Sequence, residues 1–187
     1  MLVTLVGMPG CGKSTVGRQL SRQLGWALVD TDIELERRFG MPVRSYFELH
    51  GEEAFRQEEQ AVVEEVTHRA QGVISTGGGA VLRPANREVL RARTQVFYLR
   101  ASPEDLHRRL RHDTRRPLLQ VADPLGRLRE LYRERDPLYR RTAHYVVEAA
   151  RPSVGALASM ILMQLEVAGM LDPARVPAVI GRDPGPG

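Results

Sequence analysis

Short apolar runs alternate with longer stretches of helical spacing along most of the chain. Five runs are rich in β-branched or aromatic residues and are typical of buried strands: 2–6, 27–29, 72–75, 95–99 and 144–147. The stretches with the apolar spacing of amphipathic helices are 14–24, 33–38, 42–49, 52–70, 84–91, 103–111, 124–141 and 152–168. Because strands that alternate with helices form parallel βαβ units, the pattern predicts an α/β fold with a sheet covered on both faces.

Two stretches depart from this alternation. Residues 112–123 carry several charges and Pro117 without a strand period, which predicts a loop long enough to act as a lid. From Gly169 onward the chain is rich in proline and glycine, a composition that buries too little surface to become ordered. The sequence therefore predicts one folded domain over residues 1–168 and a flexible tail over residues 169–187.

Composition narrows the class of protein. The 187 residues, 42% hydrophobic and 27% charged, are typical of one globular domain that is neither disordered nor embedded in a membrane. No apolar stretch approaches the roughly 18 residues that span a bilayer, and no basic leader precedes Leu2. The single cysteine, Cys11, excludes an internal disulfide and disfavours a structural zinc site. We expect a cytoplasmic protein without a membrane partner.

The net charge of +4 favours an anionic partner, either nucleic acid or the phosphates and carboxylates of small molecules. Charge alone does not decide between them. Among the 27 basic side chains, however, only Lys13 is a lysine. This single lysine is either kept by chance or kept because its position requires a compact ammonium group.

Lys13 belongs to the strongest motif of the chain, G-M-P-G-C-G-K-S at residues 7–14. The motif follows an apolar run and opens a helix, which is the context of a phosphate-binding loop. Lys13 would reach the β- and γ-phosphates, and Ser14 would place its hydroxyl directly on Mg²⁺. The residues expected to bind the phosphates are Gly10, Cys11, Gly12, Lys13, Ser14 and Thr15. The sequence leaves open whether the Cys11 thiol among these N–H groups is a redox control point or a tolerated substitution.

Two carboxylates, Asp30 and Asp32, follow the second predicted strand, at the edge where ligands of open α/β sheets bind. Next to a phosphate loop, Asp32 is the candidate base for an acceptor hydroxyl, and Asp30 is the candidate that supports Mg²⁺ through water. Alternatively, one of them only caps the helix that begins at Ile33. The residues alone leave both readings open.

Two weaker motifs lie farther along the chain. Arg56 and Glu59 are one turn apart on a predicted helix, a pair more often found solvated on the surface. Gly77, Gly78 and Gly79 follow the third predicted strand, where glycines let a ligand approach backbone N–H groups. An ordinary turn would have the same residues.

Arginines in the second half of the chain could also bind anions. The predicted lid contains Arg115 and Arg116, and closure could bring one of them onto a transferring phosphoryl group. Arg135 lies in a later basic helical stretch and could grip a carboxylate bidentately. Solvated surface charge is the alternative for both segments.

Taken in order, these motifs resemble the shikimate kinase family over roughly residues 1–168. The resemblance is carried by the phosphate loop followed by D-T-D, F-R-x-x-E, G-G-G, R-P-L-L and R-x-P-L-Y. It implies a three-layer α/β/α fold like that of nucleoside monophosphate kinases. That fold has a five-stranded parallel sheet in the order 2-3-1-4-5, acceptor-binding helices and a lid.

The resemblance also implies an acceptor site. Arg56, Arg135 and the backbone of the glycine motif would hold the carboxylate and hydroxyls of shikimate. Asp32 would orient and deprotonate the 3-hydroxyl, and Glu59 would position Arg56. The residues implied at this site are Asp32, Arg56, Glu59, Gly77, Gly78, Gly79 and Arg135.

A nucleotide site is implied in the same way. Lys13 and Arg116 would stabilise the transferring phosphate, and Arg109 with Arg151 and Pro152 would embrace the adenine. The third strand ends in T-G-G-G and lacks the aspartate that a generic phosphate-loop enzyme uses for Mg²⁺. The resemblance therefore shifts carboxylate support for the metal to Asp30 and Asp32, through water.

The predicted activity is ATP- and Mg²⁺-dependent phosphorylation of the 3-hydroxyl of shikimate by a monomer. Other small acceptors, such as gluconate or a nucleoside monophosphate, are the alternatives among kinases. A nucleic-acid-binding protein that uses ATP as a switch is an alternative of another class. Only 5% of the residues are aromatic and arginine is spread along the chain, so no stacking platform for nucleic acid is evident.

Overall fold

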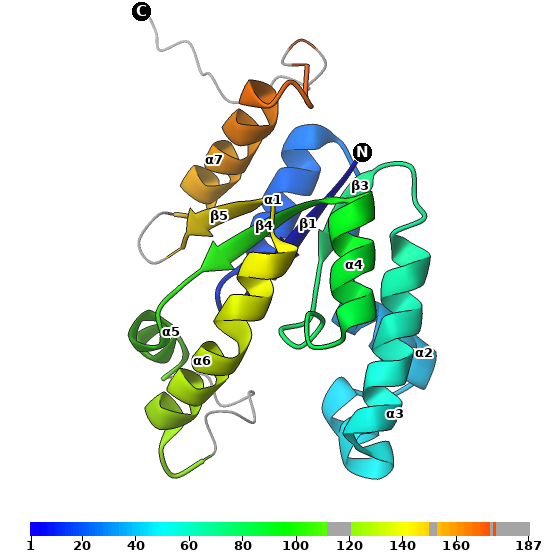
Figure 1. Ribbon diagram of the computed structural model, residues 1–187, viewed down its shortest axis with the longest axis vertical. Helices are drawn as coiled ribbons and strands as arrows, with labels where there is room; N and C mark the ends of the chain where they lie inside the picture. The colour runs from blue at the N-terminus through cyan, green and yellow to red at the C-terminus, as the bar shows by residue number, and fades with distance from the viewer. Residues whose placement is uncertain (112–120, 150–152, 173, 175–187) are drawn as a thin grey trace, which may run out of the picture.

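The computed structural model describes residues 1–111, 121–149, 153–172 and 174, and its centre is a five-stranded parallel sheet (Figure 1). The strands are β1 (Leu2–Val6), β2 (Leu28–Asp30), β3 (Gly72–Ser75), β4 (Gln95–Arg100) and β5 (Tyr145–Glu148). They lie in the order β2-β3-β1-β4-β5, which confirms the expected topology. In this register Leu5 pairs with Ser75 and Val6 with Tyr98, so the carboxyl ends of the three central strands meet at one edge.

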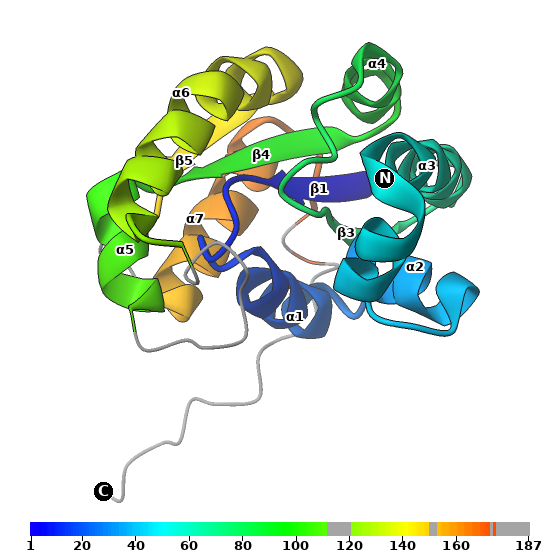
Figure 2. The same cartoon turned by 90° about the horizontal axis from the view of Figure 1, so that it is seen from below.

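Helices cover both faces of this sheet, as the alternating pattern predicts. They are α1 (Lys13–Leu24), α2 (Thr31–Phe39), α3 (Val43–Val66), α4 (Pro84–Arg93), α5 (Pro103–Leu110), α6 (Pro124–Thr142) and α7 (Val154–Val167). Helices α1 and α7 pack together on one face, and α4 and α6 lie on the other (Figure 2). The three-layer α/β/α architecture is thus confirmed.

Helix α3 contains a break that the sequence pattern marks as a boundary between two helices. Gly51 has φ 82° and ψ 172°, a conformation that is not helical and that favours glycine. The expected helices 42–49 and 52–70 therefore meet at a kink. The second one ends at Val66 instead of residue 70, where Thr67 turns its hydroxyl back onto the carbonyl of Val63.

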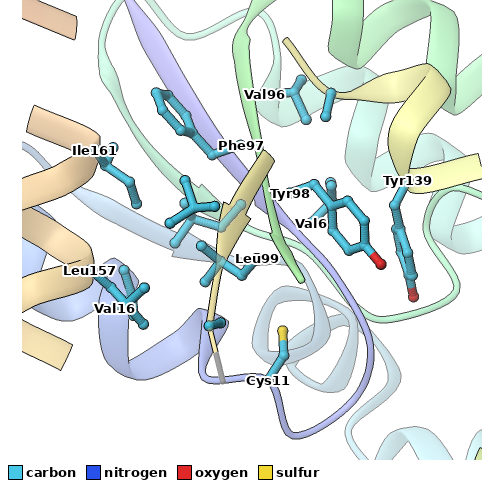
Figure 3. Packing of buried hydrophobic residues seen from close by; sticks show 14 of the residues in the cluster. Val6, Cys11, Val16, Val96, Phe97, Tyr98, Leu99, Tyr139, Leu157 and Ile161 are labelled. Atoms are coloured by element: carbon cyan, nitrogen blue, oxygen red, sulfur yellow. The ribbon is translucent and has the colours of Figure 1, made fainter. Parts of the chain in front are cut away.

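Two hydrophobic clusters hold the layers together. The larger one surrounds β1 and β4 and includes Phe97, Tyr98 and Leu99, all fully buried (Figure 3). The smaller one joins α2 and α3 to the β2 edge of the sheet through residues such as Leu35 and Phe55. This second cluster fixes α3, and with it Arg56, beside the carboxyl ends of the strands.

The first residues of the expected tail, 169–172, are packed, whereas residues 173 and 175–187 lie outside the described residues. Gly169 adopts φ 70° after the end of α7, and the N–H of Met170 donates to the carbonyl of Leu165, which closes the helix. Leu171 then packs against the larger hydrophobic cluster. Residues 169–172 therefore belong to the packed structure, because a capped helix end carries them back onto the core. No helix in the described ranges is both long and apolar enough to cross a bilayer.

Candidate active site

The loop between β1 and α1 holds its lysine by backbone contacts. Gly10 and Gly12 have φ values of 82° and 100°, in the left-handed region that glycine enters without strain. The Lys13 ammonium donates to the carbonyls of Gly7 at 2.8 Å and Met8 at 3.0 Å. The side chain is 8% exposed, so its charge is fixed inside the loop beside the N-terminus of α1.

A cavity of about 400 Å³, which we call the phosphate-loop pocket, opens beside this loop. The sequence-predicted nucleotide residues that line it are Gly10, Gly12, Lys13, Ser14, Thr15 and Arg109. The Arg109 guanidinium also donates to the carbonyls of Cys11, at 3.4 Å, and Ala149. It thus ties the phosphate loop to the segment that follows β5. Arg116, Arg151 and Pro152 lie outside the described residues, as does most of the predicted lid, residues 112–120.

Cys11 does not face this pocket. Its side chain is fully buried and belongs to the larger hydrophobic cluster, where Figure 3 shows it beneath Leu99. The thiol does not lie among the phosphate-binding N–H groups, because the loop turns it inward, where the Lys13 ammonium donates to the sulfur at 3.8 Å. Any part that Cys11 plays in binding phosphate belongs to its backbone.

The carboxylate of Asp30 caps a helix, which is one of the two alternatives that the sequence left open, and also binds the phosphate loop. One oxygen accepts the N–H groups of Asp32 at 3.0 Å and Ile33 at 3.3 Å, which caps α2. The other accepts the hydroxyl of Ser14 at 2.9 Å. Because of this cap, α2 begins at Thr31, two residues before the expected start. Asp30 both ends β2 in a fixed turn and holds the serine of the phosphate loop.

A second cavity, of about 270 Å³, lies between α3, the loop after β3, and α6; we call it the arginine pocket. Its lining includes every residue expected at the acceptor site: Asp32, Arg56, Glu59, Gly77, Gly78, Gly79 and Arg135. Four residues line both cavities: Pro9, Asp32, Gly77 and Gly78. The two pockets therefore share a wall, and the Asp32 carboxylate is the ionisable group in that wall.

The triple glycine is required by the side chains that surround it. A Cβ on Gly77 would lie 2.6 Å from Oδ1 of Asp32, and one on Gly78 would lie 2.9 Å from the ring of Pro9. A Cβ on Gly79 would overlap the guanidinium of Arg56. The glycines thus let site side chains approach the backbone, whereas the sequence suggested either the approach of a ligand or an ordinary turn.

Arg56 and Glu59 form a buried pair instead of the solvated one that is commoner at this spacing. Nη1 of Arg56 donates to Oε1 of Glu59 at 2.8 Å, and the Glu59 side chain is 1% exposed. Burial raises the pKa of Glu59, while the Arg56 charge opposes that rise. The pKa of Asp32 is also raised, first by burial and then by the negative charge of Asp30.

Arg135 differs from Arg56 because no carboxylate of the described residues forms an ion pair with it. Its Nε is buried and has no hydrogen-bond partner in the described structure. Its Nη1 lies 3.3 Å from the place that a Cβ of Gly78 would occupy. The guanidinium therefore brings a positive charge and an unused Nε donor to the pocket wall, which suits an anionic ligand.

The sequence reading missed the rest of the arginine pocket, which is apolar except for Arg127. The other residues that line it are Pro9, Val43, Phe47, Phe55, Arg127 and Leu131. Spacing gives a signal for some of them, since Arg127 and Leu131 precede Arg135 by eight and four residues on α6 and share its face. Phe47 has no such signal, because the kink at Gly51 decides where it points.

The parallel sheet in this order, the phosphate loop and a second pocket that meets it at a carboxylate define a phosphate-loop kinase with a fold like that of nucleoside monophosphate kinases. A family model described as shikimate kinase matches residues 9–166. The chain belongs to the shikimate kinase family, as the motifs in the sequence suggest.

Individual relatives agree with this assignment. A shikimate kinase from Cupriavidus pinatubonensis (strain JMP 134 / LMG 1197) is 54% identical over 164 residues, 88% of this chain and 85% of the relative. One from Paracidovorax citrulli (strain AAC00-1) is 52% identical over 175 residues, 92% of this chain and 96% of the relative. The solved structure of shikimate kinase from Acinetobacter baumannii in complex with shikimate superposes with a TM-score of 0.84 at 44% identity, covering 91% and 95% of the two chains.

Proposed function

We propose that this chain transfers the γ-phosphoryl group of ATP to the 3-hydroxyl of shikimate, giving shikimate 3-phosphate and ADP. The observation that carries the proposal is the wall shared by the two pockets, with Asp32 in it. A donor in the phosphate-loop pocket and an acceptor in the arginine pocket would face each other across this wall. Positioning of that kind supplies much of the catalysis in phosphoryl transfer.

Arg135 and Arg56 are the proposed anchors for the shikimate carboxylate. Both guanidinium groups line the pocket, and Arg135 has no acidic partner among the described residues. A guanidinium binds a carboxylate through two parallel hydrogen bonds, which fixes orientation as well as affinity. Glu59 accepts a hydrogen bond from Nη1 of Arg56, so its proposed role is to hold that guanidinium in place.

Asp32 is the proposed base. As the acceptor oxygen forms its bond to the γ-phosphorus and the bond to the β-phosphate oxygen breaks, the hydroxyl proton passes to the carboxylate. Burial beside Asp30 raises the pKa of Asp32, which makes its carboxylate a stronger base than an exposed aspartate. Lys13 would neutralise charge on the phosphates, and Arg116 stays a predicted partner in that role.

The residues of the phosphate-loop pocket fit Mg²⁺, which when bound would neutralise the phosphate charge. Ser14 offers a hydroxyl and Asp30 and Asp32 offer carboxylate oxygens, the hard donors that this ion prefers. In the described part of the chain, no group of three or more His, Cys, Asp or Glu could hold a metal ion. Ser14 would bind directly and the aspartates through water, a sparse set typical of Mg²⁺ held jointly with a nucleotide.

The proposal extends to a cytoplasmic monomer that binds neither nucleic acid nor membrane. The lone cysteine supports the compartment, since a reducing environment keeps such a thiol free. Gel filtration with light scattering tests the monomer, and a salt-dependent mobility shift with DNA or RNA would contradict the absence of a nucleic-acid partner.

The test of the proposed activity is ADP release by the purified chain with ATP and Mg²⁺. Shikimate, gluconate, AMP and no acceptor are compared, and Asp32→Asn prepared in parallel controls for contaminating kinases. Among these acceptors, we expect only shikimate to give rapid ADP release. Without an acceptor, ADP release should be slow because the site protects ATP from water. Faster turnover of gluconate or AMP than of shikimate would overturn the proposal.

A further inference from the structure

Helix α6 contacts the loop after β3 through a buried tyrosine as well as through Arg135. The hydroxyl of Tyr139 donates to the carbonyl of Gly78 at 2.6 Å. The Tyr139 ring is fully buried and lies 4.9 Å from the ring of Tyr98, centroid to centroid (Figure 3). Tyr139 is four residues after Arg135, so both side chains reach the glycine loop from neighbouring positions on one face of α6.

The carbonyl that Tyr139 binds belongs to the wall between the two pockets. Gly78 lines both cavities, and a Cβ at this position would touch the ring of Pro9 and approach Nη1 of Arg135. Small movements of this loop would therefore change the distance between the phosphate loop and the guanidinium. The hydrogen bond from Tyr139 holds the loop at the point where it separates the pockets.

The turn of α6 that carries these residues needs an external support. Pro137 lies inside the helix between Arg135 and Tyr139 and has no N–H to donate to the preceding turn. The helix therefore lacks one of its own hydrogen bonds beside Arg135. The contact between Tyr139 and Gly78 ties this weakened turn to the sheet.

We propose that Tyr139 is a positioning residue for the acceptor: by binding the Gly78 carbonyl, it fixes the glycine loop and Arg135 relative to each other. The inference rests on the proposed function, because it assumes that the arginine pocket binds the carboxylate substrate. It adds a residue for which the sequence motif R-x-P-L-Y had suggested no role.

The chemistry of the phenol supports a permanent donor. Burial raises the pKa of Tyr139 above its ordinary value, so the hydroxyl keeps its proton throughout the pH range of an assay. The hydrogen bond therefore does not switch with pH. Its effect on the acceptor is expected to be the same across the pH profile of the enzyme.

Tyr139→Phe tests the proposal, with Tyr132→Phe as the matched control. Tyr132 is on the same helix and its hydroxyl accepts from Nε of Arg100 at 2.8 Å, so the control loses one hydrogen bond between α6 and the sheet. Both variants keep the aromatic ring. We expect Tyr139→Phe to raise the KM for shikimate about fivefold to tenfold, with the KM for ATP changed less than about twofold. Tyr132→Phe should change neither KM by more than about twofold.

Hydrogen exchange supplies a readout that does not depend on turnover. The backbone amides of Gly78 and Gly79 should exchange faster in Tyr139→Phe than in the native chain and in Tyr132→Phe. Melting curves identify a temperature at which all three proteins are folded, and all assays are run there.

Three results would overturn the proposal: an unchanged KM for shikimate in Tyr139→Phe, an equal rise in both KM values, or the same rise in Tyr132→Phe. Each result counts against the proposal only if the native chain phosphorylates shikimate. If the native chain does not, the proposed function fails and this inference fails with it, whereas an active native chain with a normal Tyr139→Phe variant refutes this inference alone.

Discussion

The two pockets of this molecule are built in different ways. The phosphate-loop pocket takes six of its thirteen lining residues from one continuous segment, residues 9–15, which carries the lysine and two glycines with positive φ. The other seven come from residues 30–32, 76–78 and 109–110. The arginine pocket draws its walls from Pro9, from the start of α2, from α3, from the loop after β3 and from α6. A binding site made of backbone can be encoded in a short motif, whereas one made of side chains depends on how distant elements pack.

Charge is handled differently as well. The Lys13 ammonium donates to two carbonyl oxygens of its own loop, and no carboxylate of the described residues forms an ion pair with it. In the arginine pocket, Arg56 is paired with buried Glu59, and Arg135 is left without such a pair in the described structure. The difference predicts that substitutions in the arginine pocket act on the acceptor and leave the nucleotide largely unaffected.

The most severe expected effect concerns the carboxylate in the shared wall. Asp32→Asn removes the proposed base and keeps the side-chain volume, so kcat should fall by roughly 10²- to 10⁴-fold. The Kd for ATP, measured by calorimetry, should change by less than about twofold. Turnover close to that of the native chain would show that Asp32 does not accept the proton.

The second largest effect is expected on removal of the Arg135 guanidinium, which has no ion-pair partner among the described residues. A hydrogen bond to a charged group contributes roughly 1.5–3 kcal/mol, so Arg135→Ala should raise the KM for shikimate about 10- to 150-fold with little change for ATP. Arg129→Ala is the control, since Arg129 lies on the same helix in a surface pair with Glu104. A rise in the KM for ATP instead would mean that Arg135 serves the wrong pocket.

A methyl group in the glycine loop should have a smaller effect. In Gly79→Ala the new Cβ would displace the guanidinium of Arg56, and overpacking of this kind costs roughly 1–3 kcal/mol. Steady-state kinetics should show this cost in the KM for shikimate. Gly155→Ala is the control, because that glycine lies in α7 with no atom within 4 Å of the added Cβ. Equal kinetics for the two variants would contradict the packing role of Gly79.

The smallest expected effect is a shift in the pH profile. The raised pKa of Asp32 places the acid limb of kcat/KM above 3.8, since activity is lost as the base is protonated with falling pH. Asp30→Asn removes the neighbouring negative charge, which lowers the pKa of Asp32, so the limb should move to lower pH. Asparagine still caps α2 well, which keeps the fold intact. An unmoved limb would assign it to another group.

Sequence reasoning reached much of this picture, and its failures have physical causes. The sheet order and the gathering of Asp32, Arg56 and Arg135 around one pocket were predicted through the family motifs. The inward orientation of the Cys11 side chain was not predicted, because the loop geometry decides which way that side chain points. The burial of Glu59 was also missed, since helical spacing is the same for a buried pair and a solvated one.

The packed part of the chain also extends farther than composition predicts. Proline and glycine after residue 169 predicted a tail, yet Leu171 reaches the core through the cap at the end of α7. Composition averages over a segment, whereas a single apolar side chain after a helix cap can dock locally.

A crystal structure of the chain with shikimate and ADP tests the central claim most directly. We predict that the shikimate carboxylate contacts Arg135 and Arg56, that its 3-hydroxyl lies within hydrogen-bond distance of Asp32, and that ADP occupies the phosphate-loop pocket. Shikimate bound elsewhere, or bound with its 3-hydroxyl turned away from the Asp32 carboxylate, would contradict the account.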